Sequence, residues 1–130
     1  MTYVHRKHFS LRDAQILLKK IKPLVRELAE LKRQLDARGF DVYRHQYFGG
    51  SGPNGDKYFP AELQRLVQIL KSLDELGVLV KGLEEGLIDF PHVRANGEEV
   101  YLCFKADEEE IRFWHSLEGG FAGRRPLAEL

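Results

Sequence analysis

Two polar side chains in the C-terminal half stand inside apolar stretches, where either chemistry or tight pairing is expected. Asp89 interrupts the apolar run 87–90, and His115 ends the apolar run 111–115. A buried carboxylate is costly without a partner, so we expect Asp89 to pair with His115 or with Arg124. The structural interpretation is a hydrogen-bonded Asp89–His115 pair that holds two strands in register.

The same region also carries the side chains of a divalent metal site. Carboxylate and imidazole groups are ligands of Zn, Mn and Fe. We therefore expect a metal or polar pocket formed by four side chains, Glu85, Asp89, His115 and Glu118. The metal ligands would be Asp89, His115 and Glu118. Because His115 and Glu118 fall at the end of an expected strand, they do not form a helical HExxH-type motif.

The single cysteine, Cys103, allows two interpretations. It could act as a nucleophile with His115 as its base. Its place between Leu102 and Phe104 instead favours a buried and inert thiol in the core of a strand. A lone cysteine forms no internal disulfide, which fits a reducing compartment.

The C-terminal segment 119–126 is rich in glycine and contains Arg124 and Arg125. Converging backbone amides and arginine forks bind carboxylate or phosphate, so the two arginines could form an anion-binding site. The alternative, which we favour, is a tail that wraps the sheet, with Phe121 as an anchor and the arginines paired to nearby carboxylates. No Walker-type or dinucleotide-binding fingerprint is present.

A long first helix is expected at 9–39. Ser10 and Asp13 form a start of capping-box type, and Gly39 is a typical stop. Leucine and isoleucine then recur in steps of four and three, the heptad seam of a coiled coil, at Leu17, Ile21, Leu24, Leu28, Leu31 and Leu35. Pro23 predicts a kink within this helix.

A second helix at 60–77 has a similar stripe and folds back on the first as an antiparallel hairpin. The two are joined by an expected flexible loop at 40–58, whose Gly-rich part is 49–56. A two-helix hairpin is thin and needs more cover for its apolar stripes. We therefore expect a homodimer, and a further protein partner could use the same surface.

The second half predicts a small three-stranded antiparallel sheet. Residues 78–118 read as a meander with a turn at Asn96-Gly97, followed by an irregular Gly/Arg tail at 119–130. The whole chain, 1–130, is then a single α+β domain.

Four segments carry a family resemblance: 86–91 (Gly-Leu-Ile-Asp-Phe-Pro), 100–104 (Val-Tyr-Leu-Cys-Phe), 111–115 (Ile-Arg-Phe-Trp-His) and 119–126 (Gly-Gly-Phe-Ala-Gly-Arg-Arg-Pro). Together with Phe9-Ser10-Leu11 and the leucine-rich first helix, this series resembles the uncharacterised bacterial family catalogued as domain of unknown function 2203. The family usually has Cys-Trp in place of Cys103-Phe104, and a Gly-Glu pair in the turn at 106–108. The resemblance supports the fold and the importance of the C-terminal region, but it implies no mechanism.

The composition of the chain limits the classes of partner that it is expected to bind. The chain has 130 residues, 43% of them apolar and 31% charged, with 20 basic and 20 acidic residues. Zero net charge supplies no field for phosphate neutralisation, so we expect no nucleic acid partner. No apolar run approaches the ~20 residues that span a bilayer, and no signal peptide is visible. We therefore expect a cytoplasmic protein without a membrane partner.

Two functions follow from these patterns. The two leucine stripes and the lack of a complete catalytic set favour a non-enzymatic interaction or structural module that self-associates through its helical hairpin. The alternative is a small metal- or anion-dependent enzyme, such as a hydrolase, with a pocket around Asp89, His115 and Arg124. The sequence leaves open whether the chain is an enzyme.

Overall fold

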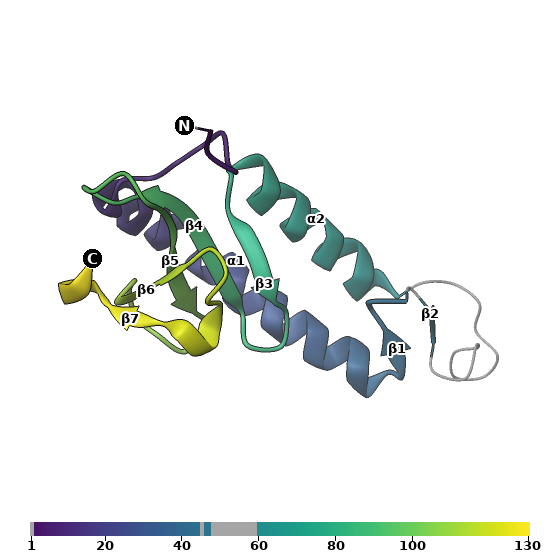
Figure 1. The fold of residues 1–130 in the computed structure, drawn as a ribbon. Coiled ribbons are helices and arrows are strands. Elements are labelled where there is room, and N and C mark those ends of the chain that lie inside the picture. The colour runs from purple at the N-terminus through teal and green to yellow at the C-terminus, as the bar shows by residue number, and fades with distance from the viewer. Residues whose placement is uncertain (1, 45, 48–59) are drawn as a thin grey trace.

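The computed structural model describes residues 2–44, 46–47 and 60–130. These residues form two helices, a two-stranded ribbon and a larger antiparallel sheet (Figure 1). In chain order the elements are α1 Leu11–Ala37, β1 Phe40–Asp41, β2 Gln46–Tyr47, α2 Ala61–Glu75, β3 Leu79–Gly82, β4 Leu87–Val93, β5 Glu99–Lys105, β6 Phe113–Ser116, the 3-10 turn η3 Phe121–Gly123, β7 Arg125–Pro126 and the 3-10 turn η4 Leu127–Glu129.

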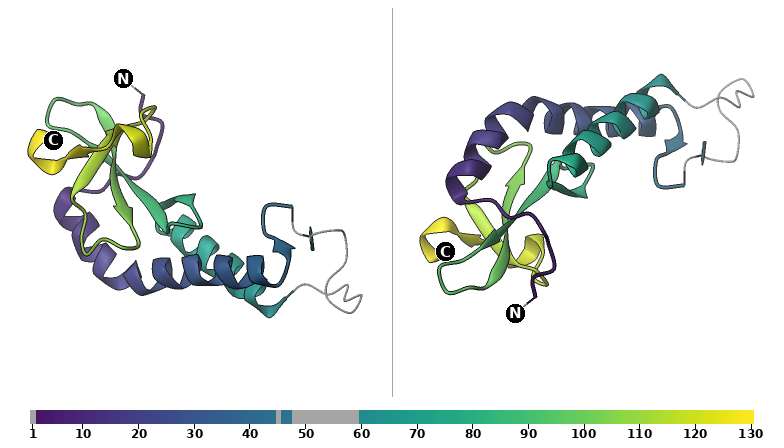
Figure 2. Two further views of the ribbon diagram at one scale, coloured as in Figure 1. Left: turned by 90° about the horizontal axis from the view of Figure 1, so that it is seen from below. Right: turned by 90° about the horizontal axis from the view of Figure 1, so that it is seen from above.

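The expected helical hairpin is present. Ser10 caps α1, because its hydroxyl oxygen accepts a hydrogen bond from the backbone N–H of Asp13 at 3.0 Å. Pro23 lies inside α1 without ending it, and the helix curves along its length (Figure 2). Proline removes one helical hydrogen bond and crowds the preceding turn, which accounts for bending here. α2 runs back along α1, and β3 follows it (Figure 1).

The buried seam of α1 matches the predicted one at Ile21, Leu28, Leu31 and Leu35. It differs at the other two predicted positions, where Leu17 and Leu24 are only partly buried and their neighbours Leu18 and Val25 are buried instead. Lys32 is also buried. The helix faces both α2 and the sheet, so its apolar stripe is wider than a coiled-coil seam. Lys32 keeps its ammonium group within this seam by bonding both carboxylate oxygens of Asp36, at 2.7 and 2.6 Å.

The segment between the helices is only partly described. Its described part contains β1 and β2, which pair with Phe40 opposite Tyr47, where a loop was expected. The Gly-rich stretch 49–56 of the predicted flexible loop lies outside the described residues. Within the described residues, neither helix is apolar over a length that could cross a membrane.

The larger sheet has five antiparallel strands in the order β3-β4-β5-β6-β7, so the prediction of three was wrong. The missed strands are the two at the edges. β7 is two residues long, Arg125 and Pro126, and lies in the tail expected to be irregular. β3 lies inside the predicted meander, 78–118, but was not counted as a strand because the Lys-Gly at its end breaks the alternation. Short edge strands of this kind are typical of native sheets.

Pro91 lies inside β4, which continues to Val93. The pairing of β3 with β4 reaches only as far as Leu79 opposite Asp89. Pro91 therefore lies beyond β3, where its missing N–H removes no bond to that neighbour.

Side chains alternate between the two faces of the sheet. One face packs against α1 and contributes Ile88, Phe90, Leu102, Phe104 and Trp114 to the core. Figure 1 shows α1 behind the sheet and the yellow C-terminal segment in front of it. The opposite face, beneath that segment, carries Asp89, Cys103 and His115.

The turn between β3 and β4 requires glycine at position 86. Gly86 has φ +62°, and a Cβ there would lie 2.6 Å from the Cβ of Ala106 and 3.2 Å from Val25 Cγ1. We expect Gly86→Ala to cost about 2–4 kcal/mol of unfolding free energy, from left-handed backbone strain plus overpacking. Gly97→Ala is the matched control, since Gly97 has φ +90° but open space around it. Denaturant unfolding that gives equal losses for the two variants would contradict the packing argument.

Candidate metal centre

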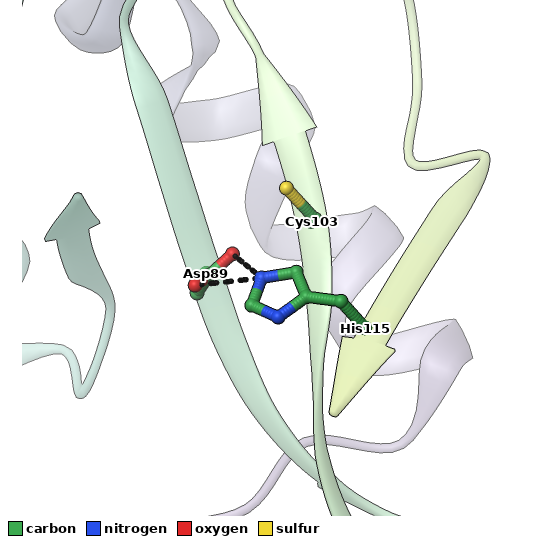
Figure 3. Close-up of side chains that lie close together, drawn as sticks. All are labelled: Asp89, Cys103 and His115. Atoms are coloured by element: carbon green, nitrogen blue, oxygen red, sulfur yellow. Dashed lines mark hydrogen bonds and ion pairs between the residues drawn. The ribbon is translucent and has the colours of Figure 1, made fainter. Parts of the chain in front are cut away.

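Three adjacent strands bring Asp89, Cys103 and His115 together (Figure 3). Asp89 on β4 lies directly opposite Cys103 on β5. His115 on β6 lies opposite Tyr101, and its ring reaches across β5 to Asp89. One ligand atom from each of the three side chains lies within 4.8 Å of the others. Their exposed fractions are 1% for Asp89, 0% for Cys103 and 3% for His115.

The hydrogen bonds of His115 define the state of its ring. Nδ1 lies 2.7 Å from the carbonyl oxygen of Ser116, which can only accept, so Nδ1 carries a proton. Nε2 lies 3.1 and 3.0 Å from the two carboxylate oxygens of Asp89. Nε2 can therefore carry a second proton toward Asp89, accept a hydrogen bond from a protonated Asp89, or share a cation with the carboxylate.

In the absence of a cation, the Asp89 carboxylate favours the protonated form of His115. Burial by itself lowers the pKa of His115, but the Asp89 carboxylate and the Ser116 carbonyl outweigh burial and raise the pKa above its ordinary value. The expected Asp89–His115 pairing is thus confirmed. A metal-bound histidine has the same outer hydrogen bond, since its second ring nitrogen usually donates to a carbonyl or carboxylate.

Cys103 is a poor nucleophile in this setting. Burial, followed by the neighbouring Asp89 carboxylate, raises the pKa of the Cys103 thiol well above its ordinary value. A protonated, fully buried thiol is inert, as the core interpretation of the sequence expects. The same sulfur can still serve as a ligand, because metal binding displaces the thiol proton.

The donor set matches a divalent ion in charge and in the type of ligand atom. One carboxylate and one thiolate cancel the charge of a divalent ion, and the imidazole adds none, so the buried centre would be neutral. Zinc bond lengths place the atoms of a tetrahedral ligand set roughly 3.3–3.7 Å apart. The three side chains would therefore have to move inward by about 1 Å from their separation of up to 4.8 Å.

The other predicted site residues lie apart from this group. Glu85 is exposed in the turn between β3 and β4, and Glu118 is exposed in the turn after β6. Of the four predicted pocket residues, the structure brings together only Asp89 and His115. The third member of the described group is Cys103 instead of Glu118.

The two arginines do not converge on one anion site. The Arg124 guanidinium stacks 4.2 Å above the Phe113 ring and bonds both carboxylate oxygens of Glu108 at 2.7 and 2.9 Å. Arg125 is exposed and lies 5.6 Å from the Trp114 ring. Since Phe113 and Trp114 are consecutive residues of β6, these rings belong to opposite faces of the sheet. Arg124 nevertheless borders the metal-ligand group, with Nη2 3.4 Å from the Cys103 carbonyl oxygen.

A second polar network, missed by sequence reasoning, holds the N-terminal segment on the sheet. The Glu99 carboxylate accepts hydrogen bonds from the backbone N–H of Val4 at 2.8 Å and of His5 at 3.0 Å, and from His8 Nε2 at 2.7 Å. His5 Nε2 lies 2.6 Å from the Tyr101 hydroxyl, and the Tyr101 ring lies 5.4 Å from the His115 ring. The segment is thus connected to the candidate metal centre through Tyr101.

The buried Glu99 carboxylate should make the stability of the fold depend on pH. Burial raises the pKa of Glu99, but hydrogen bonds from His8, His5 and Val4 outweigh burial and lower it below 4.5. A carboxyl group with a lowered pKa stabilises the fold above its unfolded pKa, and that contribution is lost as pH falls below 4.5. We expect Glu99→Gln to cost about 1.5–3 kcal/mol at neutral pH and progressively less in acid. Unfolding curves across pH check this, and a pH-independent difference would contradict it.

Comparison with known proteins identifies a family but no relative of known activity. The family model described as an uncharacterized conserved protein, DUF2203, matches residues 7–127, as the resemblance indicated. Asp89, Cys103 and His115 all lie within the matched region. Searches among curated proteins and among solved structures gave no match. The chain therefore belongs to the DUF2203 family.

Proposed function

We propose that this protein binds one divalent transition-metal ion at Asp89, Cys103 and His115. The observation that carries the proposal is the orientation of His115, whose Nδ1 bonds the Ser116 carbonyl while Nε2 faces the Asp89 carboxylate. A cysteine sulfur completes the set. Zn, Mn and Fe all suit imidazole and carboxylate, but a thiolate ligand favours Zn over Mn.

The ion is proposed to be structural. Each ligand comes from a different strand, so a bound ion would tie β4, β5 and β6 together. The three ligand residues are at most 3% exposed, and such burial is typical of a closed structural site. Three protein ligands leave one position of a tetrahedral site free. The enzymatic alternative, a metal-dependent hydrolase, would use that position for water or substrate. A cytoplasmic location would keep the Cys103 thiol reduced.

Elemental analysis of untagged, gently purified protein tests the proposal. We expect close to one Zn per chain, lost in Asp89→Asn, Cys103→Ser and His115→Gln. Glu85→Gln and Glu118→Gln serve as matched controls, because these side chains are exposed and outside the group; they should retain the metal. A wild-type protein that is isolated without metal and takes up no added Zn would refute the proposal.

Self-association through the helical hairpin is a second candidate function. Within one chain the leucine stripes are already covered, since Leu28, Leu66 and Leu73 are at most 2% exposed. The observation that favours a second copy is the exposure of Ile16 on α1 and Val67 on α2, at 47% and 44%. Light scattering after size exclusion should show a dimer that Val67→Glu dissociates. A monomer at all protein concentrations would exclude this function.

A further inference from the structure

A small cavity adjoins the candidate metal centre on the same face of the sheet. Leu87 and Lys105 form a cross-strand pair two residues along from the Asp89–Cys103 pair. Since side chains two residues apart on a strand share a face, these two lie beside the metal-ligand group. Phe121 of η3 and Glu85 of the β3–β4 turn complete the lining of a cavity of about 270 Å³.

The lining combines one carboxylate, one ammonium group and two apolar side chains. Lys105 Nζ lies 5.5 Å from the Phe121 ring centre. It also lies 3.5 Å from an Asp107 carboxylate oxygen, but that side chain is 70% exposed. Exposed ion pairs contribute little, so Lys105 can exchange Asp107 for a ligand carboxylate at little cost.

The tail places Phe121 against this cavity. Gly120 precedes it with φ +60° and ψ −168°, a backbone conformation that is essentially restricted to glycine. The guanidinium of Arg124, anchored on Glu108, lies 4.9 Å from the Phe121 ring centre. Phe121 remains 46% exposed, so a bound ligand has apolar surface left to cover.

We propose that this cavity binds a small zwitterion, an α-amino acid with an apolar side chain. Glu85 would pair with the ammonium group, Lys105 would pair with the carboxylate, and the side chain would lie between Leu87 and Phe121. The cavity volume of about 270 Å³ is below the ~300 Å³ lower bound for pockets that hold drug-sized ligands. The ligand must therefore be smaller than a drug-sized molecule, as an amino acid is. The cavity binds without any contribution from the metal ion, so the site stands independently of the proposed function.

Calorimetric titration of the full chain with L-leucine tests the proposal. L-leucinamide lacks the carboxylate and N-acetyl-L-leucine lacks the ammonium group, so each should bind at least tenfold more weakly than leucine. Glu85→Gln, Lys105→Met and Phe121→Ala should each weaken leucine binding about tenfold, roughly the 1.4 kcal/mol of one lost contact. Glu109→Gln is the matched control, because that side chain is 77% exposed and lines no part of the cavity; it should bind as wild type does.

Running each titration with the Zn-loaded and the chelator-treated protein separates this site from the metal centre. Leucine binding of similar strength in both forms supports the proposal, even if the protein binds no metal at all. Absence of leucine binding, equal binding of leucine and its two derivatives, or binding that disappears on chelation would each overturn it.

Discussion

Asp89→Ala is expected to destabilise the metal-free protein by about 3–5 kcal/mol, the usual cost of removing one partner from a buried ion pair. His115 would keep its Nδ1 bond to the Ser116 carbonyl, but Nε2 would be left without a partner at 3% exposure. Cys103, which lies opposite Asp89, offers only a neutral thiol in compensation. Because burial lowers the pKa of His115 once the Asp89 carboxylate is gone, the ring gives up its second proton. The loss is therefore the ion pair itself plus a buried Nε2 acceptor without a partner.

Denaturant unfolding in the presence of a chelator measures this loss. Glu118→Ala is the control, since exposed positions usually change stability by no more than about 0.5 kcal/mol. The double variant Asp89→Leu/His115→Leu should recover much of the loss, because it removes both charges and leaves neither unpaired. A loss below about 1 kcal/mol for Asp89→Ala would mean that the pair is not an ion pair in the metal-free protein.

Zinc binding is expected to raise the melting temperature by roughly 15 °C. Free zinc at 1,000 times its dissociation constant stabilises a protein by about 4 kcal/mol. For a chain of 130 residues, each kcal/mol corresponds to about 4 °C. The ion would replace the second proton on His115 and the thiol proton on Cys103, and would connect three strands that are otherwise held by their ladder hydrogen bonds.

Differential scanning calorimetry over a series of buffered zinc concentrations measures this rise. Cys103→Ser is the sharpest control, because it changes one ligand atom at a fully buried position and should abolish most of the shift. A melting temperature that does not respond to zinc, or that responds equally in Cys103→Ser, would exclude this centre.

The helices and the central hairpin could be predicted from sequence because their signals are local. Ser10 supplies a cap and Asn96-Gly97 supplies a turn, and both act within a few residues. The place of Lys32 in the buried seam of α1 could not be predicted, because it depends on ion pairs both with Asp36 and with Glu84 of the distant β3–β4 turn. The edge strands β3 and β7 are defined by the neighbours they pair with, and their own residues carry no alternating pattern.

The candidate site, like the fold, could be predicted only in part from the sequence. Asp89 and His115 were identified from the cost of burying polar groups in apolar runs. Cys103 could have been added from the turn, because Asp89 and Cys103 are equally distant from Asn96 and therefore face each other across the hairpin. Glu118 lies outside the metal-ligand group because β6 ends at Ser116, and the residues after Ser116 leave the sheet in a turn.

The partner of Arg124 could not have been chosen from sequence. Asp89 and several other carboxylates, Glu84 and Glu85 among them, were all plausible partners in the pattern. The structure pairs Arg124 with Glu108, in the turn between β5 and β6, because β7 adds to the sheet beside β6. A contact that depends on an unrecognised strand is not visible in residue spacing.

X-ray absorption at the zinc edge tests the central claim most directly. In zinc-loaded protein the account predicts one sulfur neighbour at about 2.3 Å and nitrogen or oxygen neighbours at about 2.0–2.1 Å, and it predicts that the sulfur disappears in Cys103→Ser. A zinc-loaded protein whose spectrum contains no sulfur would contradict the assignment of Asp89, Cys103 and His115 as the metal centre.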